Sequence, residues 1–468
     1  MDDIERRAKS AARDGVELPS EGLGLEGLTD PAEQPRRSTP LIASLAASGL
    51  VQGLNVATGV ILARELGPAG RGELAAVLLW PGLLAVLAGL GIGQAATYYA
   101  AKKETAPATL VTTSLTMAAV QALIAMFVGA LLFPLIYSGY ESETLQSAYV
   151  YLVFIPLNLA ALLLMGILNG LQFHAAFQAL RVLVIAIAAF AIVALALAGE
   201  LTVQRAVFAY LAANLLTLIA AAYAMRKAWE GPATIDRALG RSLFSFGVRS
   251  QTTTVSSLFN ERLDQLAISL FLSPASLGIY TVAVTLTALT TLVGYSVSLV
   301  ALPAVARAAK AEIAIEVRTY VAAAAGGSAL VSIPVLLLAP ELVQLFFGSA
   351  YDDAAAVSRI LLVAAVAFST SRTLEAVLQG LGQPLDAGLA EGGALIFTVI
   401  GLAILLPWLG ITGAAVASLI AYAASVAFMT RRTRAHVGLS AGELLIPRPS
   451  TWEHLVADLR RPGSRGAP

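Results

Sequence analysis

The chain contains no cysteine and only three histidines. It can therefore form no disulfide, thiolate metal site or cysteine nucleophile. The histidines, His174, His436 and His454, are too far apart in sequence to indicate a metal pair. The sequence also lacks a GxxxxGK[ST] loop, an HExxH motif and a nucleophile elbow. We therefore expect no enzyme activity, no ATP-driven motor in this chain, no cofactor and no metal.

Charged residues are also scarce. They make up 13% of the 468 residues, whereas hydrophobic residues make up 57% and the mean hydropathy is +0.78. Because a soluble domain carries about 25% charge, a chain this apolar must have lipid as its solvent. Blocks such as 181–198 are apolar on every side, which excludes the alternating strands of a membrane barrel and predicts helices.

Twelve apolar segments are long enough to cross a bilayer, which takes about 20 residues per helix. Lys and Arg gather before the first segment and after the second, sixth, eighth and twelfth, so both termini are predicted to be cytoplasmic. Arg64 and Arg71 lie in an alternate loop, where Glu65 and Glu73 partly balance them. The segments are approximately 40–63, 74–98, 108–137, 148–169, 177–198, 206–225, 244–271, 278–302, 317–339, 355–378, 387–407 and 411–430.

Two sequence patterns occur twice. Gly67-Pro68-Ala69-Gly70-Arg71-Gly72 corresponds to Ser273-Pro274-Ala275-Ser276-Leu277-Gly278, 206 positions later. Leu168-Asn169-Gly170-Leu171 corresponds to Leu378-Gln379-Gly380-Leu381, 210 positions later. This offset is too long for a solenoid and indicates a duplicated membrane bundle. We predict an all-α polytopic membrane protein with two six-helix lobes in the same orientation and a working site between them.

The predicted boundaries follow from composition. Residues 1–39 are acidic, contain Pro and Gly and lack the apolar region of a signal peptide, so we expect a disordered cytoplasmic tail. The N-terminal lobe is expected at 40–230 and the C-terminal lobe at 231–431. Residues 432–468 form a second cytoplasmic tail, in which Thr451 begins a candidate short amphipathic helix.

Polar residues inside the seventh segment are the strongest indication of a site. Arg249 and Asn260 lie eleven residues apart, which places them on one helical face, and Asp264 lies at its margin. A charge at bilayer depth costs roughly 3 kcal/mol or more, so a cavity that binds an anion is one explanation. Snorkelling of Arg249 and structural ion pairs near Arg262 are the alternatives.

Other segments carry polar residues too. Gln52 and Asn55 lie on one face of the first segment, the repeat partner of the seventh, where buried amides also serve as contacts between helices. Arg372 and Glu375 are three residues apart and could form an ion pair. The ion-coupling candidates are Asp264, Glu375 and Glu391, although Glu391 also fits an interfacial carboxylate.

Four stretches resemble a known family. Ile61–Ala75 is similar to the opening of polysaccharide-transporter flippases, the lipid-linked oligosaccharide (O-antigen flippase-like) branch of the MATE-like multidrug/oligosaccharidyl-lipid/polysaccharide exporter superfamily. Asn260–Gln265, Leu345–Tyr351 and Leu378–Gly382 resemble later family motifs in the same order. The resemblance covers about residues 40–430.

This resemblance implies a carrier in the plasma membrane. It would move a sugar chain on undecaprenyl diphosphate from the cytoplasmic to the outer leaflet by alternating access. Its partners would be this substrate, membrane lipid and, through the tails, glycosyltransferases or a polysaccharide polymerase, with no nucleic acid. On this interpretation the head-group candidates are Arg249, Arg262 and Arg372, and the sugar-facing candidates are Gln52, Asn55 and Asn260.

Three alternatives remain open. A drug or metabolite antiporter of the same superfamily should carry a cation-coupling carboxylate deep in an early segment, where this chain has amides. A major-facilitator transporter should have a Gly- and Arg-rich loop after the second segment, but the loop reads Ala100-Ala101-Lys102-Lys103-Glu104. A non-transporting scaffold for glycan synthesis would depend on its tails and not on its cavity.

Overall fold

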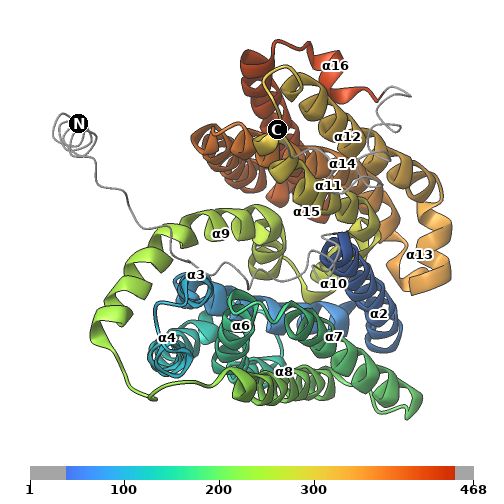
Figure 1. Ribbon diagram of the computed structural model, residues 1–468. Coiled ribbons are helices and arrows are strands. Elements are labelled where there is room, and N and C mark those ends of the chain that lie inside the picture. Colours follow the sequence, from blue (N-terminus) through green and yellow to red (C-terminus); the bar gives the residue numbers. More distant parts are fainter. Residues whose placement is uncertain (1–37, 448–468) are drawn as a thin grey trace, which may run out of the picture.

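The computed structural model describes residues 38–447, with side chains from residue 47 onward except those of 252–254. Within this part of the chain all regular elements are helices (Figure 1). The first half contains α2 (Ser38–Gly89), α3 (Ile92–Lys102), α4 (Pro107–Ile136), α5 (Ser142–Tyr151), α6 (Phe154–Gly170), α7 (His174–Leu197), α8 (Val203–Met225) and the 3₁₀ turn η2 (Arg226–Ala228).

The second half follows the same plan. It contains α9 (Arg237–Phe271), α10 (Pro274–Leu286), α11 (Ala288–Arg307), α12 (Ile313–Leu337), α13 (Ala339–Phe347), the 3₁₀ turn η3 (Ser349–Tyr351), α14 (Asp353–Gly380), α15 (Pro384–Val437) and α16 (Ala441–Leu445). Residues 1–37 and 448–468, which include the predicted helix after Thr451, lie outside the described residues.

The described residues form twelve membrane-crossing segments, as predicted. Nine helices or helix pairs are long and apolar enough to cross a bilayer. Two of them, α2 and α15, each hold two segments, because the chain reverses at Gly67 (φ 67°) and Gly410 (φ 56°), a conformation that glycine adopts without strain. The remaining segment is α9, whose polar face lowers its hydropathy. The predicted all-α polytopic fold is therefore confirmed.

Local sequence explains where the helices begin and break. Asp236 caps α9 by accepting from the backbone N–H groups of Ala238 and Leu239, and Ser273 caps α10 by accepting from that of Ser276. The fourth segment is broken between α5 and α6 just before Pro156, which cannot donate a hydrogen bond to the carbonyl group four residues earlier.

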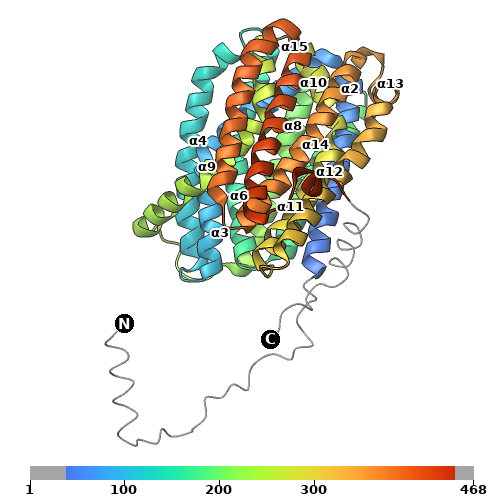
Figure 2. The ribbon, with the colours of Figure 1, turned by 90° about the horizontal axis from the view of Figure 1, so that it is seen from above.

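The two halves share a hydrophobic core at one end of the bundle only. We call this the distal end, because it lies opposite the described chain ends, which lie at the terminal end (Figure 2). The distal core contains residues of both halves, such as Leu62, Leu74, Leu277 and Tyr351. Towards the terminal end one core is drawn from residues 92–243 and another from 301–444. The halves are therefore joined distally and packed separately near the termini.

The repeated sequence motifs make the distal contact. A Cβ atom on Gly72 would overlap the carbonyl oxygen of Pro274, and one on Gly278 would overlap the carbonyl oxygen of Pro68. Each motif therefore packs on its own repeat, and the contact is reciprocal, as two-fold related surfaces require. Glycine at both positions allows α2 and α10 to approach this closely.

Helix α9 contacts both halves. Near the terminal end Gly247 packs against the backbone of Leu90 and Gly91, and Leu239 and Leu243 belong to the first-half core. Further along, α9 packs on α10 and α15, and Figure 1 shows it curving between the two groups of helices. The predicted lobe boundary at residue 231 stays a prediction, and α15 continues beyond residue 431 to Val437.

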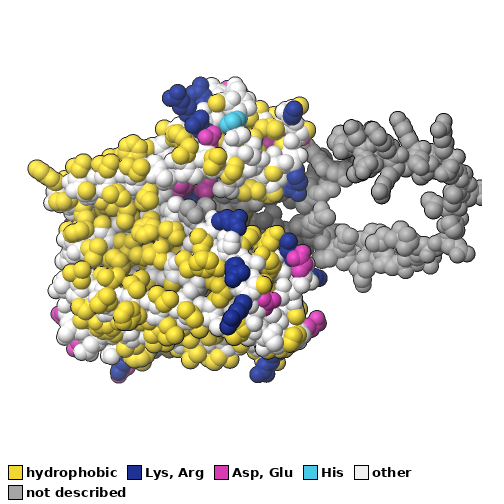
Figure 3. All heavy atoms as spheres, turned by 90° about the vertical axis from the view of Figure 1, so that its left-hand side faces the viewer, with side chains coloured by type: hydrophobic (Ala, Val, Ile, Leu, Met, Phe, Trp, Pro, Cys, Tyr) yellow, Lys and Arg dark blue, Asp and Glu magenta, His cyan; other side chains and the backbone are white. Residues whose placement is uncertain are grey.

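The surface has the pattern of a membrane protein. In Figure 3 hydrophobic side chains cover most of the visible face, whereas Lys and Arg gather towards the terminal end. Lys102, Arg226, Arg307 and Arg431 lie in or beside the connections at this terminal end. Basic side chains are therefore concentrated at the terminal end of the bundle.

We expect Gly72→Ala to destabilise the protein, because its methyl group would overlap the Pro274 carbonyl oxygen. Overpacking of this kind costs about 1–3 kcal/mol. The measurement is thermal unfolding of the purified protein in detergent. The matched control is Gly82→Ala on the same helix, where a Cβ atom meets no atom within 4 Å. Equal melting temperatures for the two variants would contradict the close contact.

Candidate functional site

A cavity of about 790 Å³ lies between the two halves. Its walls come from α2, α6 and α8 of the first half and from α9, α10, α11, α14 and α15 of the second. A cavity built by both repeats changes shape whenever one half moves against the other. Its polar lining includes Gln52, Asn55, Asn158 and Arg262.

Four of the residues predicted from sequence line this cavity: Gln52, Asn55, Arg262 and Asp264. Arg262 makes one weak hydrogen bond, from Nη1 to Gln265 Oε1 at 3.4 Å, and no ion pair among the described residues. The cavity therefore holds amide groups from the first half and a guanidinium from the second.

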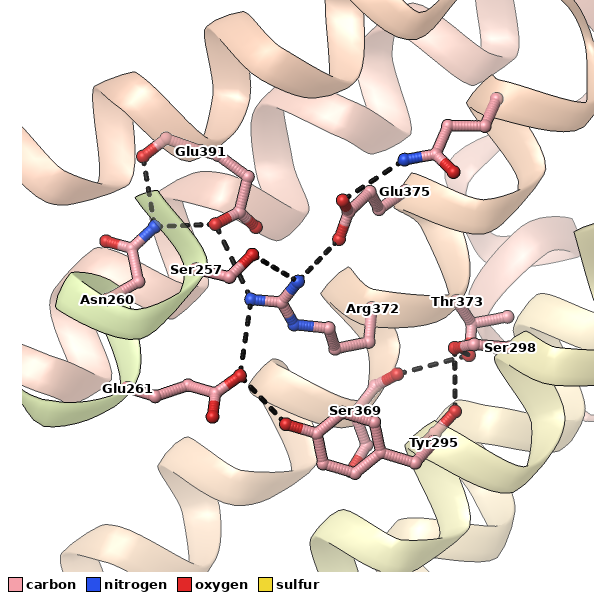
Figure 4. A network of polar contacts seen from close by, with 12 residues as sticks. Ser257, Asn260, Glu261, Tyr295, Ser298, Ser369, Arg372, Thr373, Glu375 and Glu391 are labelled. Carbon is pink, nitrogen blue, oxygen red and sulfur yellow. Dashed lines mark hydrogen bonds and ion pairs between the residues drawn. The ribbon is translucent and has the colours of Figure 1, made fainter. Parts of the chain in front are cut away.

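Arg372 is surrounded by three carboxylates (Figure 4). Nη1 lies 2.7 Å from Glu375 Oε2, and Nη2 lies 3.6 Å from Glu391 Oε2 and 3.7 Å from Glu261 Oε1. The Arg372 side chain is only 10% exposed, so water contributes little to its solvation. The predicted Arg372–Glu375 pair is thus present within a larger network.

This network ties four helices of the second half together. Glu261 is on α9 and also accepts a hydrogen bond from the Tyr295 hydroxyl group of α11 at 2.8 Å. Arg372 and Glu375 are on α14, and Glu391 is on α15. With every group ionised, the four side chains carry two more negative charges than positive ones. Such a cluster can take up a proton without losing its arginine.

Asn260 belongs to the same network and does not line the cavity. Its Nδ2 donates to Glu391 Oε2 at 2.6 Å and to the Glu391 carbonyl oxygen at 3.1 Å. The backbone carbonyl oxygen of Asn260 accepts a hydrogen bond from the Tyr422 hydroxyl group at 2.8 Å. These bonds fix α9 against α15, so the amide acts here as a contact between helices.

Asp264 is a buried carboxylate held by hydroxyl groups. Its Oδ2 accepts from the Tyr280 hydroxyl group at 2.5 Å and from Ser418 Oγ at 3.3 Å. Its Oδ1 accepts from the backbone N–H of Gln265 at 2.7 Å. No ion pair joins Asp264 to a described Lys or Arg. Three donors satisfy the charge in place of a cation.

Arg249 lies outside the central cavity. It lines a separate recess of about 540 Å³ together with Tyr99, Arg241 and Phe246. Its guanidinium folds back and donates to Ser245 O at 3.0 Å and Ser245 Oγ at 2.6 Å. The predicted placement of Arg249 in the cavity is therefore not found. The sequence prediction placed Arg249 and Asn260 on one face of a straight helix. However, α9 curves, and its first part packs on α3, so the two residues do not face the same space.

Sequence reasoning missed several cavity residues, among them Arg71. It was grouped with the loop charges near Glu65 and Glu73, but the structure places its side chain in the cavity lining. Its Nε is buried and has no hydrogen-bond partner. The repeat could have revealed this, because Leu277 occupies the equivalent position and is fully buried.

Comparisons with known proteins agree on fold and family. The family model described as polysaccharide biosynthesis protein matches residues 41–309. A stretch of 190 residues is 29% identical to the probable low-salt glycan biosynthesis flippase Agl15 of Haloferax volcanii, covering 39% of this chain and 40% of that relative. The match thus spans less than half of the relative's length.

Solved structures share the fold at low sequence identity. An inward-facing multidrug resistance MATE family transporter of the MOP superfamily is similar with a TM-score of 0.68, 17% identity and coverage of 85% of this chain and 98% of that one. The lipid II flippase MurJ in an inward closed conformation is similar with a TM-score of 0.68 and 16% identity. The match covers 84% of this chain and 87% of that one. A MOP superfamily transporter from Pyrococcus furiosus is similar with a TM-score of 0.53 and 17% identity. The match covers 86% of this chain and 97% of that one.

We expect Arg372→Ala to destabilise the protein by about 3–5 kcal/mol, because three carboxylates would lose their only cation within the network. Thermal unfolding in detergent measures this. Arg359→Ala, an exposed arginine on the same helix with one long hydrogen bond, is the control. Adding Glu391→Gln to Arg372→Ala should recover part of the loss. A melting temperature unchanged by Arg372→Ala would refute the electrostatic role of the network.

Proposed function

The chain belongs to the polysaccharide biosynthesis protein family, and we propose that it is a flippase for a lipid-linked oligosaccharide. The observation that carries the proposal is the polar cavity between two halves that share a core at only one end. Such a cavity can take the hydrophilic head of a glycolipid while the lipid tail stays in the bilayer. The similarity to a probable glycan flippase supports the same substrate class.

The substrate we propose is an oligosaccharide on undecaprenyl diphosphate, moved from the cytoplasmic to the outer leaflet of the plasma membrane. The basic terminal end supports cytoplasmic termini. Arg262 is the head-group candidate inside the cavity, because a guanidinium fork suits phosphate oxygens. Gln52 and Asn55 are positioned for sugar hydroxyl groups. Partners that assemble the glycan, such as glycosyltransferases or a polymerase, would be bound by the tails.

The other two predicted arginines would act differently. The recess of Arg249 and Arg241 is suited to attract the anionic head before it enters the cavity. Arg372 would hold Glu261, Glu375 and Glu391 in place, since its donors are directed at these carboxylates. Asp264, Glu375 and Glu391 are the proposed ion-coupling groups.

Alternating access is the proposed mechanism, and two related tyrosines support it. Tyr140 donates to Ser269 O at 3.0 Å, and Tyr351 donates to Ala63 O at 2.9 Å. The two tyrosines lie 211 positions apart in the sequence, and the two acceptor residues lie 206 positions apart, close to the offset of the repeat. Each half therefore donates an equivalent hydrogen bond to the other. Arg64 adds hydrogen bonds to the carbonyl oxygens of Leu345 and Phe346. These bonds must break if the distal end opens.

An ion-coupled antiporter of the same superfamily is the second candidate. The excess negative charge around Arg372 favours it, because a cluster of this kind can exchange a cation for a substrate. The two functions differ in their cargo. Transport of a small cation-linked solute without glycolipid transfer would support the antiporter.

We expect the purified protein in liposomes to transfer a fluorescent short-chain lipid-linked saccharide between leaflets, measured by dithionite quenching. Arg262→Gln should slow transfer about 10- to 100-fold, since charge-assisted bonds contribute about 1.5–3 kcal/mol. Arg359→Gln, an exposed arginine outside the cavity lining, is the control. Wild-type transfer no faster than in protein-free liposomes would disprove the flippase function.

We expect Tyr140→Phe and Tyr351→Phe each to favour distal opening about fivefold, because each removes a hydrogen bond worth about 1 kcal/mol. The chain has no cysteine, so Ala75→Cys, a cavity position, can report access of an impermeant maleimide from the distal side. Tyr149→Phe, whose hydroxyl group bonds Ala130 within the first half, is the control. Labelling that is equally fast in all variants would exclude a role for the Tyr140 and Tyr351 hydrogen bonds in closing the distal end.

A further inference from the structure

The guanidinium of Arg71 faces the central cavity without a counter-charge. Arg71 begins the second crossing segment of α2, between the reversal at Gly67 and the glycine contact at Gly72. Its Nε is buried and bonds to nothing, and no ion pair joins it to a described Asp or Glu. Tyr210, which lines the same cavity, and Tyr351 are close enough to interact with it electrostatically.

The carboxylates of the cavity are already engaged elsewhere. Glu261 binds Arg372 and Tyr295, and Asp264 accepts hydrogen bonds from Tyr280 and Ser418. Neither forms an ion pair with Arg71. Arg71 therefore carries a charge that no described carboxylate pairs with, whereas the excess negative charge around Arg372 lies in the second half.

A partly buried arginine whose Nε is shielded from water needs a partner that the described residues do not provide. A guanidinium stays protonated in proteins, and a charge at bilayer depth costs roughly 3 kcal/mol or more. Snorkelling does not explain this residue. Arg64, on the same helix, is exposed and donates to the carbonyl oxygens of Leu345 and Phe346, whereas Arg71 is turned into the cavity.

We propose that Arg71, together with the Tyr210 hydroxyl group, forms an oxyanion subsite at the distal end of the cavity that binds a phosphate group of a diphosphate. The inference deepens the proposed function, on which it rests for the source of the phosphate, the lipid-linked head group. Arg71 adjoins Gly72 and neighbours Tyr351, so a phosphate held here lies beside the closure that must open for release.

The test uses the purified full chain in detergent, with inorganic diphosphate as the probe and isothermal titration calorimetry as the measurement. Wild type should bind saturably, and Arg71→Gln should weaken binding at least tenfold. Arg71→Lys keeps the positive charge but loses the paired N–H donors of the guanidinium. Its affinity for diphosphate should lie between those of wild type and Arg71→Gln. Arg359→Gln, an exposed arginine outside the cavity lining, should bind as wild type does. Unchanged affinity in Arg71→Gln overturns the subsite.

A second measurement separates a binding role from a purely structural one. Without diphosphate, Arg71→Gln should melt at a higher temperature than wild type, because an uncompensated buried charge is removed. With diphosphate, wild type should gain more thermal stability than the variant. A variant that melts lower than wild type without the probe would show that Arg71 stabilises the fold, and the subsite would be rejected.

Transfer assays distinguish the subsite from the flippase function. Diphosphate binding that depends on Arg71, without transfer of a lipid-linked saccharide, would uphold the subsite for a free diphosphate and reject the flippase. Transfer that inorganic diphosphate inhibits in wild type but not in Arg71→Gln would assign the subsite to the lipid head group. Normal transfer by Arg71→Gln with unchanged diphosphate affinity would reject the subsite alone.

Discussion

The distal glycine contact is the constraint on which the rest of the structure depends. Gly72 and Gly278 bring the two halves together backbone to backbone, and the shared core forms around them. Because the halves have separate cores at the terminal end, a cavity remains between them.

Charge is distributed unequally between the halves. The second half concentrates its ionised groups around Arg372, where one cation holds three carboxylates from three helices. The first half contributes amides and the unpaired Arg71 to the cavity. In a low-dielectric interior such groups are costly unless they are compensated. The network therefore fits a coupling role, and the open guanidinium groups fit an anionic cargo.

The repeat is visible in contacts as well as in sequence. Tyr140 and Tyr351 bind the other half at related carbonyl groups, and Gly72 and Gly278 pack reciprocally. Both contacts lie at the distal end, where the two halves share a core.

The sequence by itself determined that the chain lies in lipid, that it forms twelve membrane-crossing helices and that its two halves are repeats. These features can be read from the sequence because the length of a hydrophobic segment and the bias in positive charge are local properties. The sequence also singled out Gln52, Asn55, Arg262 and Asp264, which line the cavity. Only the tertiary structure decided which charges are paired. The curve of α9 removed Arg249 from the cavity, and contacts from two other helices, α9 and α15, engaged Arg372. Arg71 was assigned to a loop because burial depends on residues some 200 positions away, which no local pattern records.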